Sequence, residues 1–422
     1  MGVKTFRDYD QDQMLLMPPS LADWIDAEHP ARLVSELVER QLDLSPVLAS
    51  YESLRGQPPY DPRMLLKVLL HGYTEGVMSS RKLAKACKLR VDFMYLSAGQ
   101  KPDHRTISDF RKRHLDALDH LFDEVLRICC EAGLVKLNHV SVDGTKIKAN
   151  ASMSRAMSYG GIGRKLLEEA ERVDAEEDEI WGESSGDELP PHLRDPKARR
   201  EALDRAKRAL EERAAQRAAG KRKVRDRDQY NFTDPDSRVM ADGPSRGWVQ
   251  GYNAQIGVDD TPHKIIVAMD VSSQASDNPQ LKPMVRQIRE RVGEFRKLSA
   301  DAGYNAEDNL QWLIEERIDG YVATSKRDED FDEPAPRGRP PAGLTAKERM
   351  TRKLRTKQGK ALYKRRKFTP EPVFGHIKHG RGMRQFLTRG LDNVQAEWKL
   401  ICIGHNIGRL AASGYRPSPK TA

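Results

Sequence analysis

The chain has 422 residues, 38% of them hydrophobic, and its 72 Lys and Arg outnumber its 63 Asp and Glu. This length and apolar content exclude a wholly disordered chain and suit about two to four domains. The basic excess favours polyanionic partners such as nucleic acid, because neutralised phosphates release their counterions, although a solvated basic surface gives the same balance. The four cysteines lack CxxC spacing, and no apolar run approaches the roughly 20 residues that span a bilayer, so we expect an intracellular protein without a membrane role.

The first third of the chain has apolar residues at helical spacing and is predicted to be an α-helical domain over residues 1–136. Ser79 and Ser80 can begin one short basic helix, and Asp103 can begin another. We interpret this pair as a DNA-docking unit of the helix-turn-helix kind, with an ordinary bundle that has a basic face as the alternative. The side chains expected to contact DNA are Arg81, Lys82, Lys85, Arg105, Arg111 and Lys112.

The pattern changes to period two at Val140–Asp143, which predicts a strand. Residues 151–245 are highly charged, and we interpret them as a helical insertion, with a flexible charged linker as the alternative. Within this segment Pro196 begins a helix and Gly220 closes it. Leu203 and Leu210 give this helix an apolar stripe too narrow for a core helix.

Strands and helices then alternate, in the order Val249–Val258 (strand), Lys264–Val271 (strand), Gln280–Val292 (helix), Lys297–Ala300 (strand), Glu307–Glu316 (helix) and Tyr321–Thr324 (strand). Residues 328–347 are rich in Pro and Gly and are predicted to be a flexible linker, and a very basic run follows. The last long helix is expected at Val394–Ala412, before a disordered tail at 413–422. The order predicts an α/β domain from residue 137 to 412.

Three carboxylates are candidate metal ligands. Asp143 lies in the first strand, Asp301 follows the strand at Lys297–Ala300, and Glu371 begins a late helical segment. Phosphodiester cleavage by two divalent ions needs carboxylates from different elements, and Mg²⁺ prefers such oxygen ligands. Turn formation, loop capping and the helix dipole also explain these three residues, and spacing alone does not exclude Asp270 or Glu397. Nearby basic side chains suited to binding phosphate are Lys146, Lys148, Arg366 and Lys378.

Five sequence blocks together resemble the bacterial insertion-sequence transposases that carry a DDE triad on an RNase H-like domain. The blocks are Pro102–Arg111, Val142–Ala149, Gly251–Gln255, Ala300–Tyr304 and Glu371–Lys378, in the order of the family. The resemblance implies an RNase H-like mixed sheet flanked by helices, with Asp143, Asp301 and Glu371 as the triad. In the family's tyrosine, arginine, glutamate and lysine signature Lys378 fits, whereas Tyr363 and Arg366 lie one residue too far upstream and Lys367 occupies the arginine position.

The resemblance also implies a function. The N-terminal helices would recognise terminal inverted repeats, two Mg²⁺ ions (or Mn²⁺) would serve each active site, and the freed 3′ hydroxyl would attack target DNA. The active unit would be a homodimer or higher oligomer on double-stranded DNA, in the bacterial cytoplasm at the nucleoid. Two alternatives stay open: a DNA-binding derivative that no longer cuts, and a metal-dependent nuclease that cuts but joins nothing.

Overall fold

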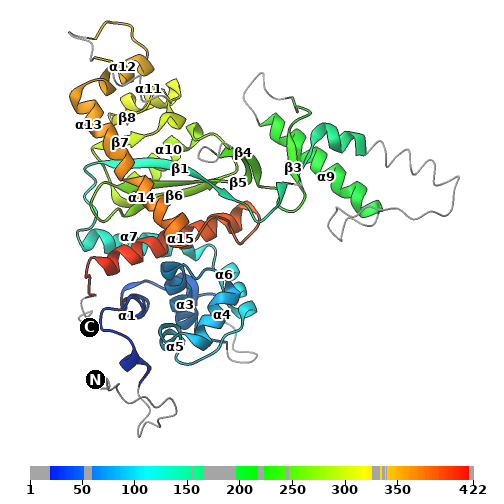
Figure 1. Cartoon of the computed structure of the whole chain (residues 1–422), viewed down its shortest axis with the longest axis vertical. Helices are drawn as coiled ribbons and strands as arrows, with labels where there is room; N and C mark the ends of the chain where they lie inside the picture. Colours follow the sequence, from blue (N-terminus) through cyan, green and yellow to red (C-terminus); the bar gives the residue numbers. More distant parts are fainter. Residues whose placement is uncertain are drawn as a thin grey trace, which may run out of the picture.

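The computed structural model describes residues 20–51, 59–153, 156–165, 196–216, 223–242, 247–325, 333–334, 338 and 340–417. These residues form an α/β fold with a mixed β-sheet flanked by helices (Figure 1). The predicted fold class is therefore confirmed at this level. Among the helices that the structure describes, none combines the length and the apolar character that crossing a bilayer requires.

The N-terminal part is helical, as predicted. Its elements are η1 (Leu21–Trp24), α1 (Pro30–Glu36), η2 (Leu37–Gln41), α2 (Ser45–Leu48), α3 (Pro62–Glu75), α4 (Ser80–Leu89), α5 (Val91–Leu96), α6 (His104–Arg113) and α7 (Ala117–Glu131). The two predicted basic helices are α4 and α6, which pack against each other and are separated in the chain by α5. Asp103 caps α6 by accepting a 2.7 Å hydrogen bond from the Thr106 amide, whereas Ser79 makes no side-chain cap on α4.

The main sheet has β1 at its centre. Its strands are β1 (Val140–Lys148), β4 (Arg238–Asp242), β5 (Gly247–Asp259), β6 (Ile266–Ser272), β7 (Lys297–Ala300) and β8 (Asp319–Val322). β1 pairs antiparallel with β5 and parallel with β7, which in turn pairs parallel with β8. The other edge of β5 pairs antiparallel with β4 and with β6. β4 corrects one expectation, because it lies inside the segment interpreted as a helical insertion and yet joins the main sheet.

The helices and helical turns that come after β6 in the chain complete this domain. They are η5 (Asn278–Gln280), α10 (Leu281–Val292), η6 (Ala302–Tyr304), α11 (Glu307–Glu315), α12 (Ala346–Leu354), α13 (Lys357–Arg365), η8 (Arg366–Phe368), α14 (Pro370–Gly375), η9 (His376–Gly380) and α15 (Leu391–Ala412). Of the predicted linker, residues 328–332, 335–337 and 339 lie outside the described residues, and α12 already begins at Ala346. Of the predicted tail, residues 418–422 lie outside them.

Helix α15, near the C-terminus, packs against helices from the N-terminal part of the chain. It lies between the sheet and the N-terminal helices and packs against α3, α7 and β6 (Figure 1). Its side chains also complete hydrogen bonds of the sheet. Asn406 Oδ1 accepts a hydrogen bond from the Ile266 backbone N–H at 2.9 Å, and Asn406 Nδ2 donates to the Ile266 carbonyl at 2.8 Å. The indole Nε1 of the buried Trp398 donates to the Gln255 carbonyl at 3.1 Å. The N-terminal helices and the sheet thus share one hydrophobic core.

A second, smaller unit projects from the sheet (Figure 1). It contains β2 (Ala156–Ser158) paired antiparallel with β3 (Gln229–Asn231), and the long helix α9 (Pro196–Ala215). α9 begins at Pro196 as predicted, whereas its predicted end at Gly220 lies outside the described residues. Leu203 and Leu210 pack with Ile162 in a small cluster apart from the main core, so a narrow apolar stripe is enough here.

Candidate active site

Asp143 and Asp301 lie side by side where the pairing of β1 with β7 ends. β1 and β7 are parallel, and their last paired residues are Val142 and Ala300. Asp143 and Asp301 are the residues that follow this pair, so each continues from its strand at the same level. β1 runs on without a turn through Gly144, which removes turn formation as an explanation for Asp143. Asp301 does cap its loop, because its Oδ1 accepts a 2.7 Å hydrogen bond from the Gly303 amide.

Both carboxyl groups are costly to ionise in this environment. Burial raises the pKa of Asp143 to about 7, against the opposing effect of Arg366 and with further increases from Asp301 and Asp277. Burial also raises the pKa of Asp301, and the Gly303 amide and Arg366 offset part of this effect. Two neighbouring carboxylates removed from water attract a cation strongly, since positive charge restores the ionised form.

Arg366 connects Asp143 with Glu371. Its guanidinium lies 3.1 Å from Asp143 Oδ2 and 3.6 Å from Glu371 Oε1. Glu371 is in the first turn of α14 and its side chain is 51% exposed, whereas Arg366 is nearly buried. The basic residue that contacts both carboxylates is therefore Arg366. Lys367, which occupies the arginine position of the family signature, is not that residue. Arg366 begins the 3-10 turn η8, which leads through Thr369 into α14.

The turn before α14 is anchored to the sheet by Asp260, at the end of β5. Its side chain is 6% exposed and contacts four groups: Thr369 Oγ1 at 2.8 Å, Arg365 Nε at 2.7 Å, Lys264 Nζ at 3.1 Å and His139 Nδ1 at 3.3 Å. Burial raises the pKa of Asp260, but hydrogen bonds from His139, Thr369 and Lys264 outweigh it and hold that pKa well below its usual range. Asp260 therefore fixes the turn that leads to Glu371.

A fourth carboxylate, Asp277, lies beside the pair and was not predicted. Its Oδ1 accepts hydrogen bonds from Lys146 Nζ at 3.1 Å, Asn253 Nδ2 at 2.7 Å and Gln255 Nε2 at 3.0 Å. A Cβ on Gly303 would come within 2.8 Å of Asp277 Oδ2 and also of Asp301 Oδ1, so only glycine fits there without a shift. The sequence pointed to Asp277 only indirectly: the three side chains that donate to it lie in two of the blocks that resemble the transposase family.

The two rival carboxylates have other environments. Glu397 is 1% exposed and accepts hydrogen bonds from the backbone amides of Leu387 and Thr388 and from the Thr388 hydroxyl, so it holds the segment before α15 in place. Asp270, on β6, accepts a hydrogen bond from the Val271 amide. It faces a small pocket whose lining includes Lys399 and Asp119, and none of the three candidate metal ligands lines that pocket.

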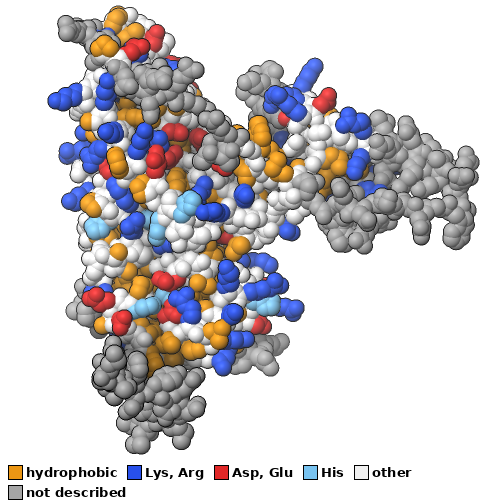
Figure 2. Space-filling model, in the orientation of Figure 1, with side chains coloured by type: hydrophobic (Ala, Val, Ile, Leu, Met, Phe, Trp, Pro, Cys, Tyr) orange, Lys and Arg blue, Asp and Glu red, His pale blue; other side chains and the backbone are white. Residues whose placement is uncertain are grey.

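The predicted phosphate-binding residues divide into two groups. Lys146, Arg366 and Lys378 lie among the site residues; Lys378 donates to Thr145 Oγ1 at 2.6 Å and to the Lys146 carbonyl at 3.0 Å, and burial lowers its pKa. Lys148 is exposed farther along β1. The six N-terminal residues lie on α4 and α6, where all except the half-buried Arg111 are exposed. Figure 2 shows Lys and Arg side chains gathered where these helices lie.

Two of the three candidate carboxylates, Asp143 and Asp301, are placed to bind a divalent ion. No three Asp, Glu, His or Cys side chains within the described ranges are gathered closely enough to hold one ion together. Asp143 and Asp301 fit the role, because they offer oxygen ligands from neighbouring parts of the sheet, and because burial raises both pKa values, so a nearby cation would favour their ionised forms. Glu371 is linked to this pair through Arg366.

Comparison with known families gives two matches. Residues 19–113, from η1 to α6, match the family described as Transposase domain (DUF772), and residues 341–411, from α12 to α15, match the Transposase DDE domain. The second match contains Arg366, Glu371 and Lys378, whereas Asp143 and Asp301 lie outside both. No curated protein and no solved structure matches the chain. The two matches, one towards each end, indicate that the chain is an insertion-sequence DDE transposase.

Proposed function

We propose that this transposase cleaves DNA hydrolytically at the ends of its element and transfers the freed 3′ hydroxyls to target DNA, with Asp143, Asp301 and Glu371 as its metal-binding triad. The observation that carries the proposal is the pair formed by the buried Asp143 and the half-buried Asp301, which directly follow the last paired residues of the parallel strands β1 and β7, with Arg366 between Asp143 and Glu371. The raised pKa of Asp143 supports binding of a further cation beside this pair, because positive charge favours the ionised carboxylate.

Two Mg²⁺ or Mn²⁺ ions at these carboxylates would supply the usual chemistry of phosphoryl transfer, by activating the attacking oxygen and stabilising the leaving one. The chain's own residues do the positioning. β1 and β7 hold Asp143 and Asp301 at one level, and Asp260 fixes the turn before Glu371. Arg366 compensates negative charge on both sides of the site, and it must yield part of these contacts for Glu371 to join the other two carboxylates.

The strand order supports an RNase H-like catalytic domain over residues 137–412. The strands lie side by side in the order β6, β5, β1, β7 and β8. β5 is antiparallel to both β6 and β1, whereas β1, β7 and β8 are parallel to one another. The chain visits them in the order β1, β5, β6, β7 and β8, with α10 before β7 and α11 before β8. The projecting unit of β2, α9 and β3 follows β1, where the charged insertion was expected.

DNA is the proposed partner, in the form of the terminal inverted repeats and the target. The exposed basic side chains on α4 and α6 support binding of DNA phosphates by the N-terminal helices, which would hold these helices against the repeats. Because one reaction joins two element ends, we propose a homodimer or higher oligomer on DNA.

Cleavage of a labelled duplex that carries the DNA flanking the gene tests the triad. Asp301→Asn should abolish Mg²⁺- or Mn²⁺-dependent cleavage while it leaves DNA affinity nearly unchanged, because it removes one ligand and none of the basic surface. Asp270→Asn is the matched control, since Asp270 is, like Asp301, a half-buried aspartate of the sheet region, and it should cleave like the wild type. Full activity of Asp301→Asn would refute the triad, and DNA binding without cleavage by the wild type would favour a regulatory derivative.

A further inference from the structure

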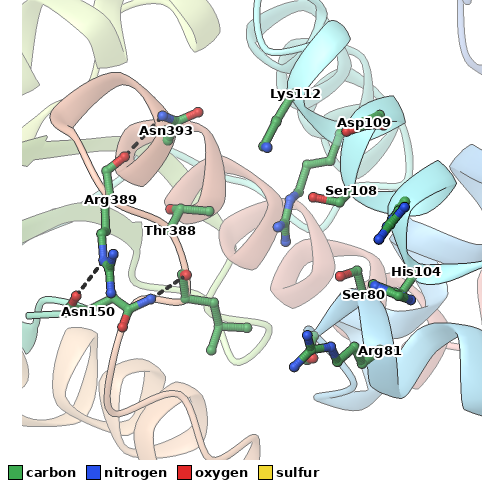
Figure 3. Close-up of a pocket in the computed structure, with 14 residues that line it drawn as sticks. Ser80, Arg81, His104, Ser108, Asp109, Lys112, Asn150, Thr388, Arg389 and Asn393 are labelled. Atoms are coloured by element: carbon green, nitrogen blue, oxygen red, sulfur yellow. Dashed lines mark hydrogen bonds between the residues drawn. The ribbon is translucent and has the colours of Figure 1, made fainter. Parts of the chain in front are cut away.

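A groove of about 820 Å³ lies between the N-terminal helices and the segment that leads into α15 (Figure 3). One wall comes from α4 and α6, with Ser80, Arg81, His104, Ser108 and Lys112. The other wall comes from Asn150, after β1, and from Thr388, Arg389 and Asn393. None of the three carboxylates of the proposed triad lines this groove, so it is a separate site.

The lining is strongly basic. Five cationic side chains line the groove, against the single acidic residue Asp109. Arg81, Arg105, Lys112 and Arg389 are exposed, and none of these four has an acidic partner among the described residues. Unpaired cations on a concave surface raise the local concentration of anions, because their fields add there.

The wall that carries Arg389 is held in position by hydrogen bonds. Arg389 Nε donates to the Asn150 carbonyl at 2.8 Å, and Asn150 Nδ2 donates to the Leu387 carbonyl at 2.9 Å. Asn393 Nδ2 donates to the Arg389 carbonyl at 3.0 Å, and the buried Glu397 accepts the amides of the preceding residues. Arg389 is thus held through Nε and through its backbone carbonyl. Because this segment is already ordered, little conformational entropy is lost when an anion binds.

The opposite wall is held by α6. Asp103 caps this helix, and Ile107 and Phe110 bury its inner face, which leaves Arg105 and Lys112 on the outer face. Arg111 donates to the hydroxyl of Tyr73 on α3 at 3.1 Å, which fixes it at the base of the same wall. Both walls therefore present cations from fixed backbone.

The chemistry of the lining indicates which anion fits. The other side chains in it are mostly hydroxyls, amides and one histidine, and Leu387 is its only apolar one. The lining has no Phe, Tyr or Trp side chain, and His104 is its one ring, so it lacks the row of aromatic side chains on which successive unpaired bases stack; this disfavours single-stranded nucleic acid. Cations with hydroxyl and amide donors are the groups that most often contact the phosphate oxygens of DNA.

We propose that this groove binds successive phosphates of double-stranded DNA, independently of sequence. The proposal rests on the proposed function and adds Arg389, Asn393 and Asn150 to the DNA-binding surface, which the sequence did not suggest. Apart from Asn150, the residues of its walls lie in the two segments that match transposase families, so DNA in the groove contacts the N-terminal helices and the segment before α15 at once.

The test is the salt dependence of binding to two duplexes, one with the DNA flanking the gene and one of unrelated sequence, for wild type, Arg389→Ala and Arg105→Ala. Each lost phosphate contact lowers the slope of log affinity against log salt by about 0.9. We expect this decrease in both variants, on both duplexes, with an affinity loss of about threefold to tenfold at roughly 0.1 M salt. Arg286→Ala is the control, because Arg286 is an exposed arginine on α10 beside Trp312, away from the groove.

The outcomes separate the groove from the proposed function. Unchanged slopes for Arg389→Ala and Arg105→Ala, with a wild type that binds and cleaves DNA, would overturn the groove alone. A loss confined to the flanking duplex would indicate base recognition and would also overturn it, as would an equal loss in the Arg286→Ala control. A wild type that binds neither duplex would overturn both proposals. Both groove residues are exposed, so the variants should keep the wild-type circular dichroism and melting temperature.

Discussion

Replacing Asp143 by Asn should make the metal-free protein more stable while it abolishes cleavage. The pKa of Asp143 is raised to about 7 by burial, well above the usual range for an aspartic acid. Since one pKa unit corresponds to about 1.4 kcal/mol, keeping this carboxylate ionised in the folded protein costs up to about 4 kcal/mol. Asn resembles the protonated carboxyl in shape and charge, so the variant avoids this cost.

The pH dependence has a defined sign. A carboxyl whose pKa is higher in the folded than in the unfolded state stabilises the fold fully below about pH 4, and this stability is lost as the pH rises through about 7. Asp143→Asn should therefore equal the wild type near pH 4 and exceed it by about 2 to 4 kcal/mol at pH 8.

Urea unfolding in EDTA at several pH values measures this difference. Asp308→Asn is the control, because its side chain is 84% exposed, and it should give no such pH-dependent gain. Mg²⁺ should stabilise the wild type and have no such effect on Asp143→Asn. An Asp143→Asn protein that is less stable than the wild type at pH 8, or a difference that does not change with pH, would show that Arg366 already compensates the buried charge.

Two further predictions concern the residues around the site. Asp277→Asn should weaken Mn²⁺ binding and cleavage by about tenfold or more, because the amide keeps one acceptor oxygen for Lys146, Asn253 and Gln255 but removes a negative charge beside Asp143 and Asp301; unchanged Mn²⁺ affinity in a calorimetric titration would contradict this. Asp260→Asn should lower the free energy of unfolding at pH 7 by about 2 to 4 kcal/mol, because buried charged hydrogen bonds are lost. Since its surroundings hold the pKa of Asp260 well below its usual range, this stabilisation should begin to decrease as the pH falls below about 4 and should be lost fully only well below that pH. A loss that is the same at pH 3 and pH 7 would refute the reasoning.

Local sequence patterns predicted the elements that carry the site. The alternating pattern of β1 and the succession from α10 to β8 depend on neighbouring residues, so they can be recognised in the sequence. Placing Asp143 beside Asp301 required only that β1 and β7 be adjacent, as they are. Choosing these residues over Asp270 and Glu397 required the family resemblance.

The rest depends on contacts between distant parts of the chain. Asp277 follows β6 in a segment without a pattern, and only the fold brings it to Lys146 and Gln255. The groove joins α6 to residues 387–393, which nothing local in the sequence predicts. β4 was missed because its few apolar residues lie in a highly charged segment, and its place is set by pairing with β5.

The measurement that tests the account most directly is a transposition assay with purified protein, Mg²⁺ and a plasmid that carries the flanking element ends. Wild type should cut at the ends and form joined products, and Asp143→Asn, Asp301→Asn and Glu371→Gln should form neither. Joined products from any of the three variants would contradict the triad, and cutting without joining by the wild type would indicate a nuclease in place of the proposed strand transfer.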